Sequence, residues 1–259
     1  MRVTVSPLPP APGGVPLAGR SCLVVDVLRA TSSIAMLLDA GFEAIYPAGS
    51  IAEGRARRDQ LEARLGRRVL LCGEERALPP QGYDRGNSPS ELRSVREAEP
   101  ALREAVIATS NGTKALLACR EAALVVAAAP LNASAVTALA LAAGNDVLVV
   151  CSGTGGERSR DDELAAGLLV QRLVRAGARP EGEAAAFLER YEAVADDLAA
   201  AFRETRHGRL LIELGFDLDI ALCTTVDRVD RAGVLGIEDG LPVLRPSCGG
   251  GAGGAAAGG

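Results

Sequence analysis

The sequence predicts an α/β protein in which a mostly parallel sheet is covered by helices on both faces. Short apolar runs rich in β-branched residues recur along the chain, and such runs are typical of buried strands. Segments with apolar residues at helical spacing separate most of these runs. Because parallel neighbouring strands need crossover connections, which are usually helices, this alternation favours a parallel arrangement.

Seven runs are predicted as strands because they are short, apolar and mostly β-branched. They are residues 22–25, 44–46, 69–72, 105–108, 124–127, 147–151 and 220–223. The longest helical pattern spans residues 183–204, and another helix is expected from Asp161 to Ala176. The apolar stripe of the longer pattern, which we expect to face the core, consists of Phe187, Tyr191, Val194, Leu198 and Phe202.

The composition excludes several classes of protein. The chain has 259 residues, of which 48% are apolar, enough for one large α/β domain or two smaller ones. A net charge of −5 and the lack of tryptophan argue against nucleic-acid binding, so we expect small molecules as partners. Neither a signal-peptide core nor a membrane-spanning apolar stretch is visible, and a cytoplasmic location is therefore expected.

We expect residues 1–245 to form a single α/β region, with two subdomains as the alternative. Residues 246–259 are expected to be a disordered tail, because a run of Gly and Ala cannot bury enough surface to offset its ordering entropy. The six cysteines are scattered without a Cys-x-x-Cys pair. They are interpreted as core residues rather than as zinc ligands or disulfides.

A polar segment, Asp-Val-Leu-Arg-Ala-Thr-Ser-Ser, follows the first of these strands at residues 26–33. It falls where a strand becomes a helix, and open α/β sheets bind ligands outside the carboxyl ends of their strands. Helix N-termini there offer free N–H groups to anions, so the position favours a site for an anionic substrate. The alternative is that residues 31–33 cap the helix and that Asp26 forms an ion pair with Arg29.

Further polar clusters rich in small hydroxyl or amide side chains follow other predicted strands. They are residues 73–76, 86–91, 109–114, 131–134 and 151–157. Such groups beside glycine can approach an oxyanion closely. Turn chemistry is the alternative for Gly86-Asn87 and Asn111-Gly112, and the sequence has no established nucleotide-binding signature.

Carboxylates within these clusters are candidate ligands for a cation. They are Asp26, Glu74, Glu157, Asp161 and Asp162. Hard oxygen donors suit magnesium, which keeps waters and often bridges to a phosphate. Helix capping is the alternative for Asp161 and Asp162. His207, the one histidine, is interpreted as an ordinary residue at a helix start rather than as a catalytic base.

Taken in order, these residues resemble the signatures of the 2-phosphosulfolactate phosphatase family. The matching segments are 26–31, 72–74, 82–89, 109–113, 132–134, 152–154, Asp162 with Ala166-Gly167, 207–215 and 219–223. The resemblance covers roughly residues 1–245 and implies a three-layer α/β/α fold with a mostly parallel or mixed sheet. It also implies a magnesium-dependent hydrolase that removes phosphate from (2R)-2-phospho-3-sulfolactate, giving 3-sulfolactate on the route to coenzyme M.

The resulting hypothesis assigns Asp26 and Arg29 as catalytic residues. Mg²⁺ is expected to be held by Asp26, Glu74 and Asp162 through waters, while Arg29 neutralises charge in the transition state. Whether Asp26 attacks phosphorus or holds the metal is left open. The predicted substrate-binding residues are Thr31, Asn87, Ser88, Asn111, Gly112, Thr113, Asn132, Ser152, Gly153 and Thr154.

The chain departs from the family pattern at two places near these residues. Arg85 stands where an apolar residue is expected, and Glu75-Arg76-Ala77 stands where a Gly-rich turn is expected. Two alternatives to the predicted function are a phosphatase for another 2-phospho-carboxylate and a non-catalytic module that binds an anionic metabolite. A homo-oligomer is expected if the apolar helical surface of residues 133–143 packs against a second copy.

Overall fold

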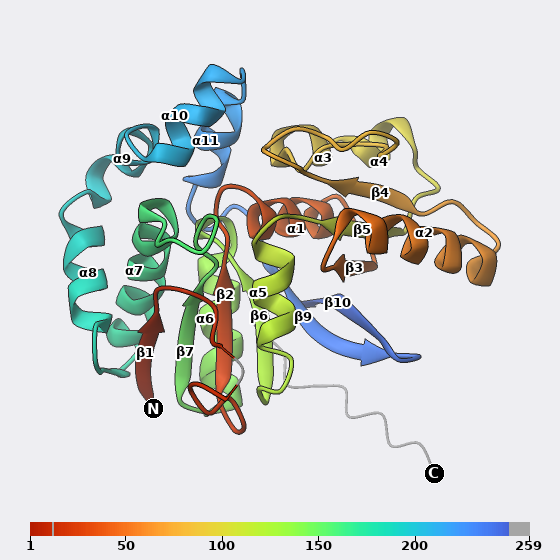
Figure 1. The fold of residues 1–259 in the computed structure, drawn as a ribbon. Helices are drawn as coiled ribbons and strands as arrows, with labels where there is room; N and C mark the ends of the chain where they lie inside the picture. Colours follow the sequence, from red (N-terminus) through yellow and green to blue (C-terminus); the bar gives the residue numbers. More distant parts are fainter. Residues whose placement is uncertain (12, 249–259) are drawn as a thin grey trace, which may run out of the picture.

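The computed structural model describes residues 1–11 and 13–248, and it confirms the α/β fold class. A ten-stranded mixed sheet runs through the molecule, and helices cover both of its faces (Figure 1). The strands are β1 (Arg2–Ser6), β2 (Ser21–Val25), β3 (Ala44–Ala48), β4 (Leu70–Gly73), β5 (Glu104–Ala108), β6 (Leu124–Ala128), β7 (Val147–Cys151), β8 (Arg179–Pro180), β9 (Arg231–Glu238) and β10 (Leu241–Cys248). The α-helices are α1 (Ala30–Asp39), α2 (Ile51–Leu65), α3 (Pro89–Leu92), α4 (Val95–Ala98), α5 (Gly112–Ala118), α6 (Ala133–Ala143), α7 (Arg160–Arg175), α8 (Ala184–Glu192), α9 (Leu198–Arg203), α10 (Arg206–Glu213) and α11 (Asp217–Cys223), with 3₁₀ turns η1 (Pro130–Asn132) and η2 (Ala195–Asp197).

The strand order is β4-β5-β3-β10-β9-β6-β2-β7-β1-β8. Pairing is parallel within β4-β5-β3 and within β6-β2-β7-β1-β8. The β9–β10 hairpin lies between these two groups and pairs antiparallel with both. The sheet is therefore built from two parallel groups joined by a central hairpin.

β2 lies between β6 and β7 in the larger parallel group, and all five of its residues are buried. Its side chains alternate between the two faces, with Leu23 in one core cluster and Val24 in another. At its carboxyl end, Val25 lies beside Ala128 of β6 and Cys151 of β7. The segments that follow these three strands therefore leave the sheet at the same edge.

Two secondary-structure predictions were wrong. Residues 220–223 belong to helix α11 instead of a strand, with Ile220 and Cys223 buried one turn apart and Ala221 exposed. A short apolar run cannot by itself distinguish a strand from a buried helix face. The expected long helix over residues 183–204 is divided into α8, η2 and α9. It restarts because the Asp197 side chain accepts a hydrogen bond from Ala200 N and caps α9.

The expected boundary of the C-terminal tail also needs correction. Residues 246–248 are the end of β10, where Pro246 pairs with Gly233 and Ser247 with Ala232 of β9. The rest of the predicted tail, residues 249–259, lies outside the described residues. The hairpin turn is Asp239-Gly240, with positive φ at both residues, which is a standard signal for a two-residue hairpin.

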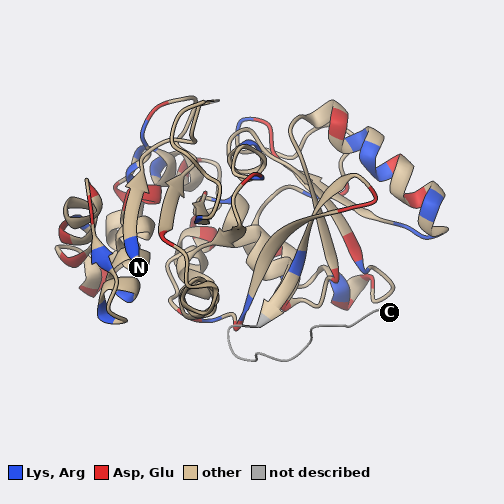
Figure 2. Cartoon of the chain, turned by 90° about the horizontal axis from the view of Figure 1, so that it is seen from below, with Lys and Arg blue, Asp and Glu red and all other residues tan. Residues whose placement is uncertain are grey.

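Charged side chains gather on the helices that surround the sheet, and α2 at the right of the molecule carries many of them (Figure 2). The parallel strands β2, β3, β4, β6 and β7 contain no charged residue, as expected for strands covered on both faces. In the part of the chain that the structure describes, no helix is long and apolar enough to cross a membrane.

Candidate active site

A cavity of about 890 Å³ opens at the carboxyl ends of the parallel strands. Its walls come from the segments that follow β2, β4, β5 and β7 and from the start of α10. Segments far apart in the sequence thus meet at one place, which is the edge of an open α/β sheet where ligands bind.

Asp26 follows β2 and lines the cavity, with 7% of its surface exposed. Its Oδ1 accepts a hydrogen bond from Ala30 N at 3.2 Å. The Thr31 hydroxyl fixes the Asp26 backbone, accepting from its N–H at 3.1 Å and donating to its carbonyl at 2.9 Å. A Cβ at Gly112 would lie 2.6 Å from Asp26 Oδ2, so glycine allows the start of α5 to approach this carboxylate.

Burial raises the pKa of the Asp26 carboxyl to about 7. The Ala30 N–H opposes this shift, whereas the negative charges of Glu74 and Asp161 add to it. The ionised form of Asp26 is therefore disfavoured by burial and by nearby negative charge, and a bound cation would favour it.

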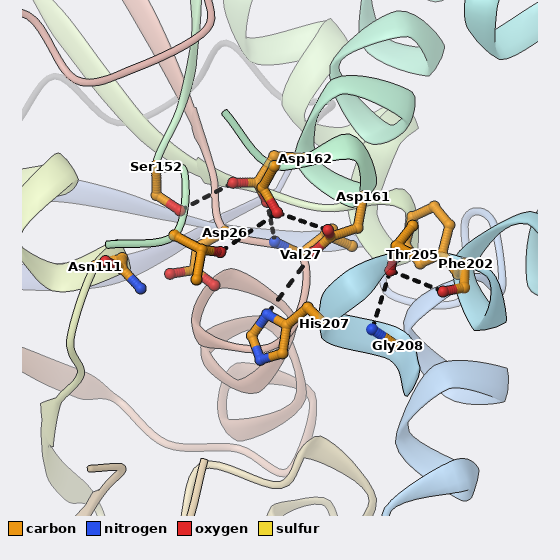
Figure 3. A network of polar contacts seen from close by, with 12 residues as sticks. Asp26, Val27, Asn111, Ser152, Asp161, Asp162, Phe202, Thr205, His207 and Gly208 are labelled. Atoms are coloured by element: carbon orange, nitrogen blue, oxygen red, sulfur yellow. Dashed lines mark hydrogen bonds and ion pairs between the residues drawn. The ribbon is translucent and has the colours of Figure 1, made fainter. Parts of the chain in front are cut away.

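Asp162 is also buried, but it does not line the cavity. Its Oδ1 accepts from Val27 N, and its Oδ2 accepts from Gly153 N and from the Ser152 hydroxyl, each at 3.0 Å. Burial, together with the charges of Asp161 and Asp26, raises the pKa of Asp162 well above its usual range. The carboxyl group of Asp162 ties the end of β2 to the end of β7 (Figure 3).

The predicted set of three carboxylate ligands is therefore not assembled. Within residues 1–11 and 13–248, no three His, Cys, Asp or Glu side chains form a group that could hold a metal ion. Asp162 is set apart from the other two by its position, because it does not line the cavity and its oxygens accept hydrogen bonds from the ends of β2 and β7. Asp26 and Glu74 do line the same cavity.

Arg29 lines the cavity, but its guanidinium already donates hydrogen bonds to other parts of the protein. Its Nη1 donates to Asp219 Oδ2 at 2.8 Å and its Nη2 donates to the Ala77 carbonyl at 2.6 Å. The group also stacks on the Phe216 ring, 4.3 Å from its centroid, and the Arg29 and Asp219 side chains are only 2% and 0% exposed. Arg29 thus joins the start of α1 to the segment after β4 and to α11, and the catalytic role predicted for it remains a prediction.

Glu74 and Asn87, which follow β4, line the cavity and carry oxygen atoms that can accept hydrogen bonds or bind a cation. Glu74 accepts from Ser110 N at 2.7 Å and from Ala77 N at 2.9 Å, which fixes its carboxylate. Asn87 is 2% exposed, and its Oδ1 is buried with no hydrogen-bond partner among the described residues. An unsatisfied buried amide oxygen beside a cavity is a strong acceptor for a ligand or a cation.

His207, which the sequence analysis set aside, lies in this cavity. Thr205 caps α10 by accepting from Gly208 N at 2.9 Å, and this cap fixes His207 between them. The imidazole Nδ1 lies 3.9 Å from Asp161 Oδ2, a contact drawn as a dashed line in Figure 3. His207 lines the cavity together with Asp26 and Asn111. Burial lowers the pKa of His207, opposed by Asp161, so the neutral ring is favoured at neutral pH.

Of the predicted substrate-binding residues, four line the cavity: Asn87, Asn111, Ser152 and Thr154. The other six do not line it: Thr31, Ser88, Gly112, Thr113, Asn132 and Gly153. Their polar groups have local partners instead. For example, Asn132 is 1% exposed and joins Ala129 N to the Ala127 carbonyl, and Ser88 donates to Asp219.

The cavity also contains cationic side chains that the sequence analysis did not select. Arg158 pairs with Glu163 and Glu183, and Arg206 pairs with Glu157. The others, for which no ion pair or hydrogen bond occurs among the described residues, are Arg76, Lys114 and Arg160. A cavity lined by free cations suits a substrate with several anionic groups.

The sequence of this chain is similar to those of known proteins. Residues 14–236 match the family model described as 2-phosphosulpholactate phosphatase. The chain is 38% identical to a probable 2-phosphosulfolactate phosphatase of Thermotoga petrophila over 82% of this chain and 87% of that protein. Proteins with the same name from Thermus thermophilus (36%, covering 82% and 86%) and Clostridium perfringens (32%, covering 83% and 85%) are also similar. The chain belongs to the 2-phosphosulpholactate phosphatase family, whose name describes phosphoric monoester hydrolases.

Proposed function

We propose that this chain hydrolyses (2R)-2-phospho-3-sulfolactate to 3-sulfolactate and phosphate. The names of its relatives support this activity. The observation that carries it is that Asp26, Asn87 and His207 line one cavity together with unpaired cations. Phosphate, carboxylate and sulfonate give the substrate three anionic groups, which complement those cations. A place on the route to coenzyme M and a cytoplasmic location are part of the same proposal.

Mg²⁺ is the proposed cofactor, and the donors in the cavity fit it. Asp26, Glu74 and the Asn87 amide oxygen would hold the ion, and all three offer hard oxygen atoms. A group of three carboxylates is not required, because Mg²⁺ is often bound by one or two carboxylates, waters and substrate phosphate oxygens. When bound, the ion would supply positive charge that stabilises the transferred phosphoryl group.

His207 is the proposed proton acceptor. The neutral imidazole can take a proton from the water that attacks phosphorus, and the charge of Asp161 at 3.9 Å then stabilises the imidazolium. The bond from phosphorus to the substrate's C2 oxygen breaks, and this oxygen leaves with the bonding electrons and is protonated from solvent. Arg29 has a positioning role here, because it holds the segments that carry Asp26 and Glu74.

The proposal is tested by measuring phosphate release from racemic 2-phospho-3-sulfolactate, with Mg²⁺ and with EDTA. Phospholactate, phosphoglycolate and a nucleotide serve as comparison substrates. We expect magnesium-dependent release that is selective for phosphosulfolactate. Preferred release of phosphate from another 2-phospho-carboxylate would support a phosphatase activity but contradict the proposed substrate. No release from any of them would favour the non-catalytic binding module.

A further inference from the structure

A tight turn beside the cavity has an unusual backbone conformation. Glu75 N donates to the Leu78 carbonyl at 2.9 Å, and Leu78 N donates to the Glu75 carbonyl at 3.2 Å. The two residues between them, Arg76 and Ala77, have φ values of 54° and 66°. Positive φ at both central residues is the signature of a type I′ turn, which favours Asn and Gly. This turn is one of the two places where the chain departs from the family pattern, which has a Gly-rich turn here.

The surrounding structure holds this turn in place. Glu74 accepts a hydrogen bond from Ala77 N at 2.9 Å, and Arg29 donates to the Ala77 carbonyl at 2.6 Å. Ala77 itself is 6% exposed and packs in the core. Residues other than glycine in the left-handed region are strained, and such strain persists where neighbouring contacts impose it, often at functional sites. The strained turn therefore calls for a functional explanation.

The side chain of Arg76 provides one. Arg76 is exposed and lines the cavity, and no hydrogen bond or ion pair to its guanidinium occurs within residues 1–11 and 13–248. Of the other cavity arginines, Arg29, Arg158 and Arg206 pair with carboxylates, whereas Arg160, like Lys114, has no such partner among the described residues. The turn thus buries Ala77 and presents an unpaired cation at its other central position.

We propose that Arg76 binds an oxyanion of the substrate that is not transferred, either the carboxylate or the sulfonate. This inference rests on the proposed function and adds a residue that determines specificity. The transferred phosphoryl group has to reach Asp26, which is 93% buried, whereas Arg76 is exposed at the cavity wall. A guanidinium matches the geometry of such oxyanions and keeps its charge at any pH in which the enzyme works.

Two variants separate the charge from the turn. Arg76→Gly removes the cation and relaxes the backbone, and Ala77→Gly relaxes the same turn but keeps the cation. Arg76→Gly should raise the melting temperature by roughly 1–4 °C because glycine tolerates positive φ. Ala77→Gly should raise it by less, because it also removes a buried methyl group from the core. Only Arg76→Gly should raise KM for phosphosulfolactate, by about tenfold, with kcat within about twofold of the wild type.

Phospholactate, which lacks the sulfonate, identifies the group that is bound. If Arg76 binds the sulfonate, Arg76→Gly changes KM for phosphosulfolactate only; if it binds the carboxylate, KM rises for both substrates. Equal KM values for Arg76→Gly and Ala77→Gly would overturn the proposed role of Arg76 without contradicting the proposed phosphatase activity.

Calorimetric titration with 3-sulfolactate gives a test that does not depend on turnover. We expect the wild type and Ala77→Gly to bind it about tenfold more tightly than Arg76→Gly. If the wild type releases no phosphate, the proposed function fails, and this titration still decides the role of Arg76. Equal affinities, or no binding to any of the three proteins, would overturn that role.

Discussion

The end of β2 and the start of α7 each bury an aspartate, but the two carboxyl groups are placed for different tasks. Asp162 has three hydrogen-bond donors around it and no access to the cavity. Asp26 accepts a hydrogen bond from Ala30 N and lines the cavity. The difference shows that burial of a carboxylate does not by itself indicate a role in catalysis or in ligand binding. The two carboxylates differ in their hydrogen bonds: both oxygens of Asp162 accept from the surrounding chain, whereas, within the described residues, the one hydrogen bond to the Asp26 carboxylate goes to Oδ1.

The largest expected effect comes from Asp26→Asn. The amide keeps the size of the side chain but cannot supply the negative charge proposed to hold the cation. We expect the rate of phosphate release to fall by roughly 1,000-fold, measured at saturating Mg²⁺. Circular dichroism should show an unchanged fold. Activity within about tenfold of the wild type would show that Asp26, like Asp162, is structural.

Asp26 should also make the stability of the metal-free protein depend on pH. Its pKa is raised from 3.8 to about 7, so between these values the folded protein binds a proton that the unfolded chain does not. Stability should therefore fall as pH rises from about 4 to about 7 and level off above that, by up to roughly 4 kcal/mol from this group.

The measurement for this effect is urea unfolding in EDTA at pH 5 and pH 8, for the wild type and for Asp26→Asn. The variant lacks the titrating group, so it should be more stable than the wild type at pH 8, with a smaller difference at pH 5. An equal difference at both pH values would contradict the raised pKa of Asp26.

Asp162→Ala should act on stability instead. It leaves Val27 N, Gly153 N and the Ser152 hydroxyl without their buried acceptor, at a cost of about 3 kcal/mol. Asp161→Ala is the matched control, since Asp161 is the next residue on α7 and accepts from Ser159 only. Its cost in urea unfolding should be about 1 kcal/mol or less. If the two variants unfolded at the same urea concentration, the structural role of Asp162 would be refuted.

The sequence was sufficient to predict six of the eight parallel strands, β2 to β7, and the edge of the sheet at which the cavity opens, but it did not predict β1 or β8. The signal of the predicted strands is local: a β-branched run such as Val147–Cys151 is followed by small polar residues. The central hairpin was not predicted, because β9 and β10 alternate weakly and contain glycines and prolines. Its one clear signal was Asp239-Gly240, a hairpin turn.

Part of the candidate site could be located from the sequence. Asp26, Glu74, Asn87 and Asn111, all selected from the sequence, line one cavity, since each follows a strand or a loop at the same edge of the sheet. Their roles stay predictions. His207 could not be placed, because it reaches the cavity through α10, far away in the sequence. Its status as the only histidine was the one available signal.

The smallest expected effect comes from replacing Ser152, whose hydroxyl interacts with both aspartates. The Ser152 hydroxyl donates to Asp162 Oδ2 at 3.0 Å, and it also lowers the pKa of both Asp26 and Asp162. Ser152→Ala should therefore cost about 1 kcal/mol of stability and shift the pH profile of activity upward by a few tenths of a unit. Ser159→Ala is the control, because its hydroxyl donates to Asp161 instead.

The two readouts of Ser152→Ala separate the two aspartates. A loss of stability reports on Asp162, whose buried acceptor loses a donor, and a shift in the pH profile reports on Asp26, whose charged form becomes harder to reach. If stability falls while the profile stays in place, the hydroxyl serves Asp162 alone, and the two carboxyl groups act independently. If both change, the Ser152 hydroxyl couples Asp162, which stabilises the fold, to Asp26, which lines the cavity.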